Sequence, residues 1–255
     1  MTPVGPRCPD HATQGRPSVR APVRQRASRR FAYVRTDQPF VSYGLIGVNV
    51  LVYLITVAQG HGGINSPGGS LFAKWVLYGP AVANGDWWRL ITAAFLHANV
   101  LHIGLNMLAV GWLGVPVERF VGHLRYLALY LVSGLAGSAG ALIANPTGIT
   151  VGASGAVFGI LGALLIIEYQ QTGNIAGQAF TLIVINLAFS FTVNGISVGG
   201  HIGGLIGGIA AMLAMSRFGR SHVAYGRPGL LGVAALMGVA LLSVAVSYWK
   251  VRGYA

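Results

Sequence analysis

The chain has 255 residues, of which 54% are hydrophobic and 9% are charged, and it contains 38 glycines. With a mean hydropathy of +0.64, this composition excludes an ordinary soluble domain and predicts an all-α polytopic membrane protein. The formal net charge of +12 would suit a nucleic-acid-binding protein if the chain were soluble. In so apolar a chain we expect the charge to set topology and attract anionic lipid, so membrane lipids and no nucleic acid are the predicted partners.

Apolar segments recur along the chain at the length of about 20 residues that a helix needs to cross roughly 30 Å of hydrocarbon. Spans are predicted at about 41–60, 91–113, 124–143, 152–170, 178–194, 197–216 and 229–249. These limits divide the chain into a tail (1–40), a six-helix core (41–216) with a long loop at 61–90, and a cytoplasmic connection followed by a seventh helix (217–255).

The tail is rich in Arg and Pro and lacks the apolar stretch of a cleavable signal peptide, so we expect it to be disordered. It holds eight of the 17 basic residues, and the connections on the same side of the membrane add Arg119, Arg125, Arg217, Arg220 and Arg227. The positive-inside rule therefore predicts a multi-pass protein of the cell membrane with a cytoplasmic N-terminus and an outside C-terminus. An Arg-rich, acid-poor leader also fits an organelle transit peptide.

Metal binding is not predicted anywhere in the chain. Cys8 and His11 have half of a zinc-site spacing, but no second cysteine pair completes it, and a single cysteine excludes an intramolecular disulfide. His97 and His102 lack a third ligand of the usual kind. We therefore expect neither a metal nor a cofactor.

The loop at 61–90 ends in Trp87-Trp88-Arg89, directly before the second span. Paired tryptophans beside an arginine suit the headgroup level, with the rings in the interface and the guanidinium reaching water or phosphate. This loop is the one outside connection long enough to form a separate interfacial element.

Three polar residues, His97, His102 and Asn106, fall within the predicted second span. His102 and Asn106 are four residues apart and share a helix face. A single histidine in a span is often a packing residue, but three polar groups on one short stretch favour a functional site. The third span, which follows a charged connection, is interpreted as scaffold.

The fourth span opens with Gly152-Ala153-Ser154-Gly155. Ser154 lies near the N-terminal end of this helix, where free N–H groups favour a developing negative charge. Gly155 and Gly159 form a GxxxG pair that lets another helix approach closely. Taken alone, a serine in such a setting is usually a packing residue.

The sixth span carries His201 near its outer end, followed by Gly204 and Gly208 on the same face. If this glycine face meets that of the fourth span, the imidazole comes within hydrogen-bond reach of Ser154, as a general base requires. Phe158, one turn after Ser154, offers an aromatic face to hold the ring.

Acidic residues are too scarce to complete a triad. Glu168 lies 14 residues after Ser154, about 21 Å along the helix, and Glu118 is also on the inside. Asp86 is not excluded by its position, but nothing places it behind His201. The pattern favours a Ser–His dyad, with His102, Asn106 and the backbone N–H of Ser154 as candidate oxyanion donors.

In combination these motifs resemble the rhomboid intramembrane serine proteases over about residues 41–216. The resemblance implies Ser154 as nucleophile, His201 as general base, and His102 and Asn106, with His97 upstream, as support for the oxyanion. It also implies a membrane-embedded loop at 61–90, and a lateral substrate gate formed by the fifth span with the second. Phe158 stands where tyrosine is frequent, and the seventh span fits a 6+1 arrangement.

The expected activity is therefore serine endopeptidase cleavage of membrane proteins in or near their transmembrane segments, with transmembrane proteins as substrates. Two other functions stay open. A catalytically silent relative would bind membrane proteins without using the dyad. A transporter would need polar residues along a path to both faces, whereas here they cluster at one depth.

Overall fold

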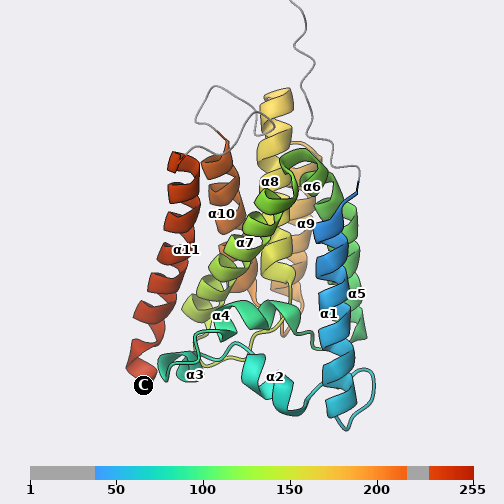
Figure 1. Ribbon diagram of the computed structural model, residues 1–255, viewed down its shortest axis with the longest axis vertical. Helices are drawn as coiled ribbons and strands as arrows, with labels where there is room; N and C mark the ends of the chain where they lie inside the picture. The colour runs from blue at the N-terminus through green and yellow to red at the C-terminus, as the bar shows by residue number, and fades with distance from the viewer. Residues whose placement is uncertain (1–37, 217–229) are drawn as a thin grey trace, which may run out of the picture. The chain divides into compact units, whose positions relative to one another are not determined.

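The computed structural model describes residues 38–216 and 230–255. The regular structure of this part of the chain is helical (Figure 1), and its only β-pairing is an isolated antiparallel bridge between Leu77 and Thr150. The α-helices are α1 (Phe40–Gln59), α2 (Gly69–Trp75), α3 (Gly79–Ala83), α4 (Arg89–Thr92), α5 (Val100–Ala109), α6 (Val115–Val121), α7 (His123–Ala144), α8 (Ser154–Thr172), α9 (Gln178–Thr192), α10 (Val198–Met215) and α11 (Leu230–Val251). Short 3₁₀ turns cover Ala93–Phe95 and Arg252–Tyr254, and a π-helical turn, Val110–Gly114, joins α5 to α6.

Six helical stretches of the described residues are long and apolar enough to cross a membrane: 40–59, 100–121, 123–144, 154–172, 198–215 and 230–254. The helix predicted at 178–194 is α9, which has 15 residues, or about 22 Å of helix. The main apolar core is formed by buried side chains of α1, α5, α6, α7, α8 and α10, including Tyr126, Leu129, Ile160 and Met212.

The predicted start of the second span at about residue 91 is wrong by nine residues. Residues 89–95 form α4 and a 3₁₀ turn, and the spanning helix begins at Val100. Asn99 sets this start, because its side-chain oxygen accepts the backbone N–H of His102 at 2.9 Å. Such an N-cap satisfies one of the free amides of a helix's first turn and begins a new helix there.

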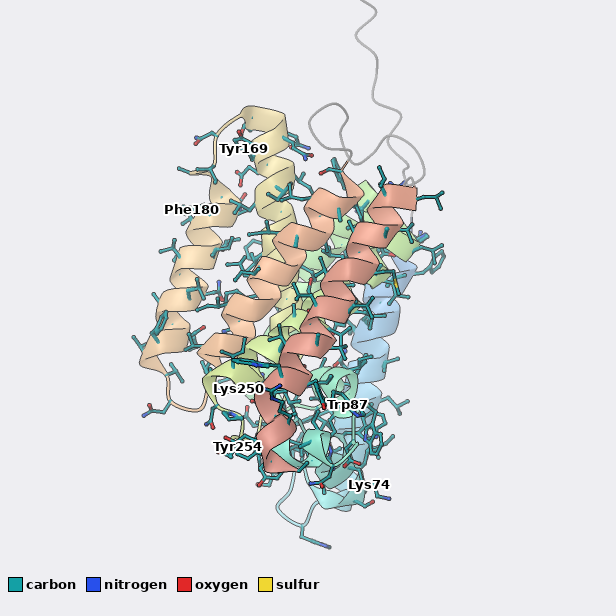
Figure 2. The ribbon with its side chains drawn as sticks, turned by 90° about the vertical axis from the view of Figure 1, so that its left-hand side faces the viewer. Lys74, Trp87, Tyr169, Phe180, Lys250 and Tyr254 are labelled. Carbon is teal, nitrogen blue, oxygen red and sulfur yellow. The ribbon has the colours of Figure 1, made fainter. Side chains whose placement is uncertain are left out.

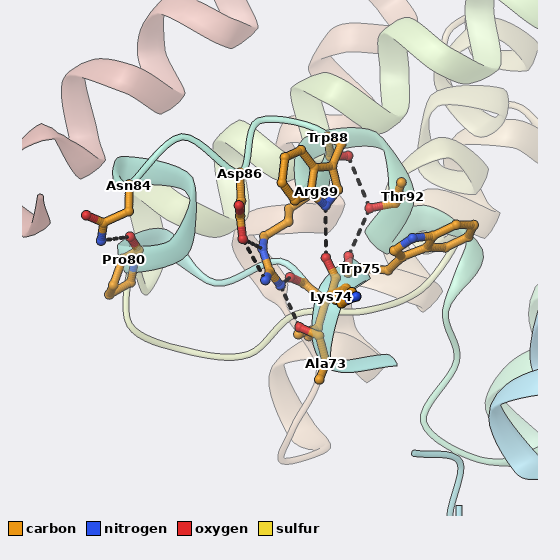
Figure 3. Close-up of polar contacts among 10 residues, drawn as sticks. Ala73, Lys74, Trp75, Pro80, Asn84, Asp86, Trp88, Arg89 and Thr92 are labelled. Atoms are coloured by element: carbon orange, nitrogen blue, oxygen red, sulfur yellow. Dashed lines mark hydrogen bonds and ion pairs between the residues drawn. The ribbon is translucent and has the colours of Figure 1, made fainter. Parts of the chain in front are cut away.

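The loop at 61–90 folds into α2 and α3 and is tied to α4 (Figure 3). Arg89 is buried, and its Nη1 donates to the carbonyls of Ala73 and Val76 at 2.8 Å while its Nε donates to Asp86. The expectation that this guanidinium reaches water or phosphate is wrong, because the last carbonyls of the short helix α2 need donors and Arg89 supplies them.

Both tryptophans before Arg89 are substantially exposed. Trp88 Nε1 donates to the carbonyl of Lys74, which fixes α4 to α2 (Figure 3). Trp87 contacts Tyr248 of α11 with ring centroids 5.9 Å apart, at the end of the bundle where Figure 2 shows Trp87 and Lys250. The C-terminal end of α11 therefore packs against the region of the short helices and supports it.

A buried carboxylate, Glu118, anchors the opposite end of the bundle. Its oxygens accept the backbone N–H groups of Val41 and Ser42 at 2.9 and 2.7 Å and the hydroxyl of Ser42 at 2.6 Å. His123 Nδ1 lies 2.5 Å from the same group. The carboxylate therefore satisfies free amides in the first turn of α1 and joins α1, α6 and α7.

Replacing Glu118 by alanine is expected to cost about 3 kcal/mol of stability, because it leaves several buried donors without an acceptor. Thermal unfolding in detergent measures the change. The Glu118→Gln variant keeps the shape and one accepting oxygen, so its loss should be smaller. An alanine variant as stable as the unmodified protein would contradict this account.

Glycines bring α8 and α10 into direct backbone contact. A Cβ added at Gly204 would lie 2.0 Å from the carbonyl oxygen of Gly155, and one at Gly208 would lie 2.2 Å from that of Gly159. The two predicted glycine faces therefore meet, and no larger side chain fits between these helices at either level.

The expectations for the basic tail, including Cys8 and His11, and for Arg217, Arg220 and Arg227 concern residues 1–37 and 217–229, which lie outside the described residues.

Candidate active site

Ser154 is the first residue of α8, so its backbone N–H is one of the free donors at the start of that helix. The preceding segment is fixed by a hydrogen bond from Gly152 N to Ala93 O at 2.9 Å and by the Leu77–Thr150 bridge. Gly152 has φ of +123°, a conformation that other residues rarely adopt. Together these constraints present Ser154 at a defined position beside α4 and the 3₁₀ turn.

His102 lies against this same segment. A Cβ at Gly152 would be 2.7 Å from both Cε1 and Nε2 of the imidazole, so glycine is required by space as well as by conformation. His102 Nδ1 accepts the N–H of Ala98 at 3.4 Å, a long contact. In the neutral ring the proton then resides on Nε2, which makes this nitrogen a donor beside the backbone that leads to Ser154.

His97 precedes α5 rather than lying within it, and its buried ring meets that of His102 edge to face at 5.1 Å. Burial, and next the neighbouring His102, lower the pKa of His97 to about 3, so this imidazole is neutral at neutral pH. Asn106 is buried, and its Nδ2 donates to the carbonyl of His102 at 2.9 Å. Its amide is thus directed along α5.

His201 lies in the first turns of α10, opposite the start of α8. Its imidazole stacks on Phe158, with centroids 4.2 Å apart and an interplanar angle of 19°. Phe158 is one turn after Ser154, and Gly204, one turn after His201, touches the backbone of Gly155. The predicted stacking is present, and the serine and histidine occupy facing turns of two helices in contact.

Direct bonding between the two residues is not part of this geometry. Among the described residues, Ser154 Oγ has no hydrogen-bond partner and Nε2 of His201 makes no hydrogen bond, whereas Nδ1 of His201 lies 2.7 Å from Ser190 Oγ. The carboxylates of the described region are engaged elsewhere: Asp86 with Arg89, Glu118 with Ser42, and Glu168 with the N–H groups that begin α9.

Ser190 is the residue of this cluster that the sequence reasoning missed. It lies on α9, is 3% exposed, and contacts Nδ1 of the imidazole, the nitrogen that the acid of a triad would contact. A signal was available, because a hydroxyl within a predicted span is a candidate for a polar contact. Serine is so frequent in such helices, however, that nothing in the pattern distinguished this one.

A cavity of about 30 Å³ lies beside Ser154, large enough for one or two water molecules. Its lining combines small residues of α7, α8 and α10 with hydroxyl groups, including Gly137, Thr150, Ser154, Ser197 and Gly200. The position next to Ser154 makes it a suitable place for a water molecule near the reactive hydroxyl.

Comparison with known proteins identifies related chains. A family model of the rhomboid domain matches residues 84–218. The chain is 34% identical over 221 residues to rhomboid protease GluP of Bacillus subtilis (strain 168). The aligned region covers 85% of this chain and 41% of that protein. It is 37% identical over 136 residues to YdcA of the same organism (51% and 68%), and 35% identical over 159 residues to RHOMBOID-like protein 5 of Arabidopsis thaliana (58% and 51%). This chain therefore spans about two fifths to two thirds of the length of these relatives.

Proposed function

Since the chain belongs to the rhomboid family and is a multi-pass membrane protein, we propose that it is an intramembrane serine endopeptidase that cleaves transmembrane protein substrates. Ser154 is the nucleophile and His201 the general base of a Ser–His dyad. The observation that carries this proposal is the stacking of His201 on Phe158 across the glycine contact of α8 and α10. It holds an imidazole over the helical turn that begins with a free serine hydroxyl.

The chemical sequence follows from these positions. Nε2 of His201 takes the Oγ proton of Ser154 as Oγ adds to the scissile carbonyl carbon, giving a tetrahedral intermediate. The C–N bond then breaks, the imidazolium returns the proton to the leaving amine, and an acyl ester remains on Ser154. Water, deprotonated by His201, hydrolyses this ester and restores the hydroxyl. The cavity beside Ser154 can supply that water from a short distance.

The oxyanion is stabilised by donors at the start of α8. The backbone N–H of Ser154 is free at the helix N-terminus, and Nε2–H of His102 lies beside Gly152. His97 supports the ring of His102 from its edge. Asn106 takes part if its amide rotates away from the carbonyl of His102, to which it now donates. Each such donor contributes about 3–4 kcal/mol where one has been removed from a comparable site.

Substrate enters from the side of the bundle, past α9. This helix buries only Ala179, Ile183 and Ser190, while Phe189, Phe191 and other large apolar side chains are exposed. A helix held by so few contacts is the element that can give way to an incoming segment. The substrate must unwind locally to offer a peptide bond, and we place the site near the outer membrane face, with the N-terminus of the enzyme cytoplasmic.

Covalent labelling tests the dyad. A fluorophosphonate probe is expected to label the detergent-purified protein at Ser154, identified by mass spectrometry of the modified peptide. The His201→Ala variant is expected to lose labelling while remaining folded, because the base that activates the hydroxyl is gone. Absence of labelling in a well-folded preparation would favour the binding relative over the protease.

A further inference from the structure

The hydroxyl of Ser190 connects the imidazole of His201 to the backbone of α9. Its Oγ lies 2.6 Å from the carbonyl oxygen of Asn186, one turn earlier in the same helix, and 2.7 Å from Nδ1 of His201. Ser190 and His201 are both buried, at 3% and 7% exposure. Neither contact is therefore open to exchange with bulk water.

Counting protons fixes the direction of both bonds. A carbonyl oxygen can only accept, so the single proton of the Ser190 hydroxyl is donated to Asn186. The contact with His201 must then use a lone pair of Oγ, which requires a proton on Nδ1 of the imidazole. In the neutral ring Nε2 is left unprotonated, and this is the nitrogen that has to receive the proton of Ser154.

We propose that Ser190 is a positioning residue that holds His201 in the tautomer and orientation required of a general base. The inference rests on the proposed function and deepens it. The Ser190 hydroxyl supplies a hydrogen-bond acceptor for Nδ1 of His201. No carboxylate of the described region does so, because each is bonded elsewhere. In serine hydrolases with a triad, an aspartate fulfils this role, and its loss leaves the wrong tautomer.

The same contact acts during the reaction. When Nε2 takes the proton from Ser154, the imidazole becomes an imidazolium with an N–H at both nitrogens. The Nδ1–H bond to Ser190 Oγ then becomes charge-assisted and stronger. No proton passes to Ser190, whose own proton stays on the bond to Asn186, so the proton balance of the dyad is unchanged.

Two other features of the site do not select the tautomer and rotation of the His201 ring. Phe158 stacks on the face of the imidazole, which limits tilting but does not distinguish one ring nitrogen from the other. The glycine contacts between α8 and α10 set the spacing of the two helices, not the rotation of the side chain. Of the hydrogen bonds in the described part of the chain, the one that this ring makes is the bond from Nδ1 to Ser190 Oγ.

The test compares Ser190→Ala and Ser190→Thr with the unmodified protein, using cleavage of a single-span substrate in liposomes. Ser190→Ala is expected to lower kcat roughly 10- to 100-fold with little change in KM, the range found when a metal-binding histidine loses the partner of its other ring nitrogen. The rate of fluorophosphonate labelling at Ser154 should fall by the same factor. Ser190→Thr keeps an accepting hydroxyl and should retain most of the activity.

A matched control is Ser247→Ala, which removes a buried hydroxyl of α11 that also donates to the carbonyl four residues earlier, at 2.8 Å. It should leave kcat unchanged. Activity of Ser190→Ala equal to that of the unmodified protein, or equal losses in the alanine and threonine variants, would overturn the positioning role while the dyad stands. An unmodified protein that neither cleaves nor is labelled would instead overturn the proposed function.

Discussion

Ser154→Ala is expected to abolish cleavage of a single-span substrate in liposomes, with kcat lower by about 10⁴-fold or more. The variant lacks the only atom proposed to form the acyl ester, and the remaining oxyanion donors stabilise a charge that no longer develops on a covalent intermediate. Cleavage is measured from the ratio of product to substrate on gels over time. Because the Ser154 side chain makes no hydrogen bond in the described structure, the fold should be preserved.

The matched control is Ser243→Ala, which removes a serine hydroxyl of α11 that donates to the carbonyl of Val239 at 2.8 Å. Ser243 is far from the site in the chain. The Ser243→Ala variant is therefore expected to cleave at a rate within a few-fold of that of the unmodified protein. Residual cleavage by Ser154→Ala at a rate near that of the control would show that another group is the nucleophile.

Gly204→Ala is expected to produce the second-largest loss of cleavage activity. The new methyl group would lie 2.0 Å from the carbonyl oxygen and 2.8 Å from the Cα of Gly155, so backbone rather than a mobile side chain must move. Overpacking of this kind costs about 1–3 kcal/mol of stability. A shift of about 1 Å between the nucleophile and its base lowers the rate by about 100-fold.

Thermal unfolding in detergent and liposome cleavage measure the two effects separately. Gly47→Ala is the control, because a Cβ at that helical position meets nothing within 4 Å. Alanine there should leave activity unchanged and raise stability by up to about 1 kcal/mol. Unchanged stability and activity of Gly204→Ala would contradict the close contact of α8 and α10.

The parts of the site that follow from periodicity were predictable from the sequence. Gly204 and Gly208 follow His201 at helical spacing, and Phe158 follows Ser154 by one turn, so facing helices bring these residues together. Both features are present in the structure. The roles of Ser154 and His201 stay a prediction until the variants are made.

Other features depended on contacts between segments that no local pattern specifies. The hydrogen bond between His201 Nδ1 and Ser190 Oγ joins residues 11 apart across a turn between two helices. Arg89 resembles an interfacial arginine in sequence, yet it is buried because the end of α2 folds back onto it. The late start of the second span followed from the cap at Asn99, which hydropathy alone does not reveal.

The contact of α8 with α10 has a mechanical consequence. Backbone packed on backbone has no rotamers to change and little void to compress, so the spacing between Ser154 and the helix of His201 is stiff. On its other side His201 is held by α9, which runs along the edge of the bundle (Figure 2) and buries little of its own surface. The imidazole is thus held on one side by the rigid contact of α8 with α10 and on the other by the more easily displaced helix α9. Outward displacement of α9 relaxes the orientation of the base without separating the two helices that carry the reactive groups.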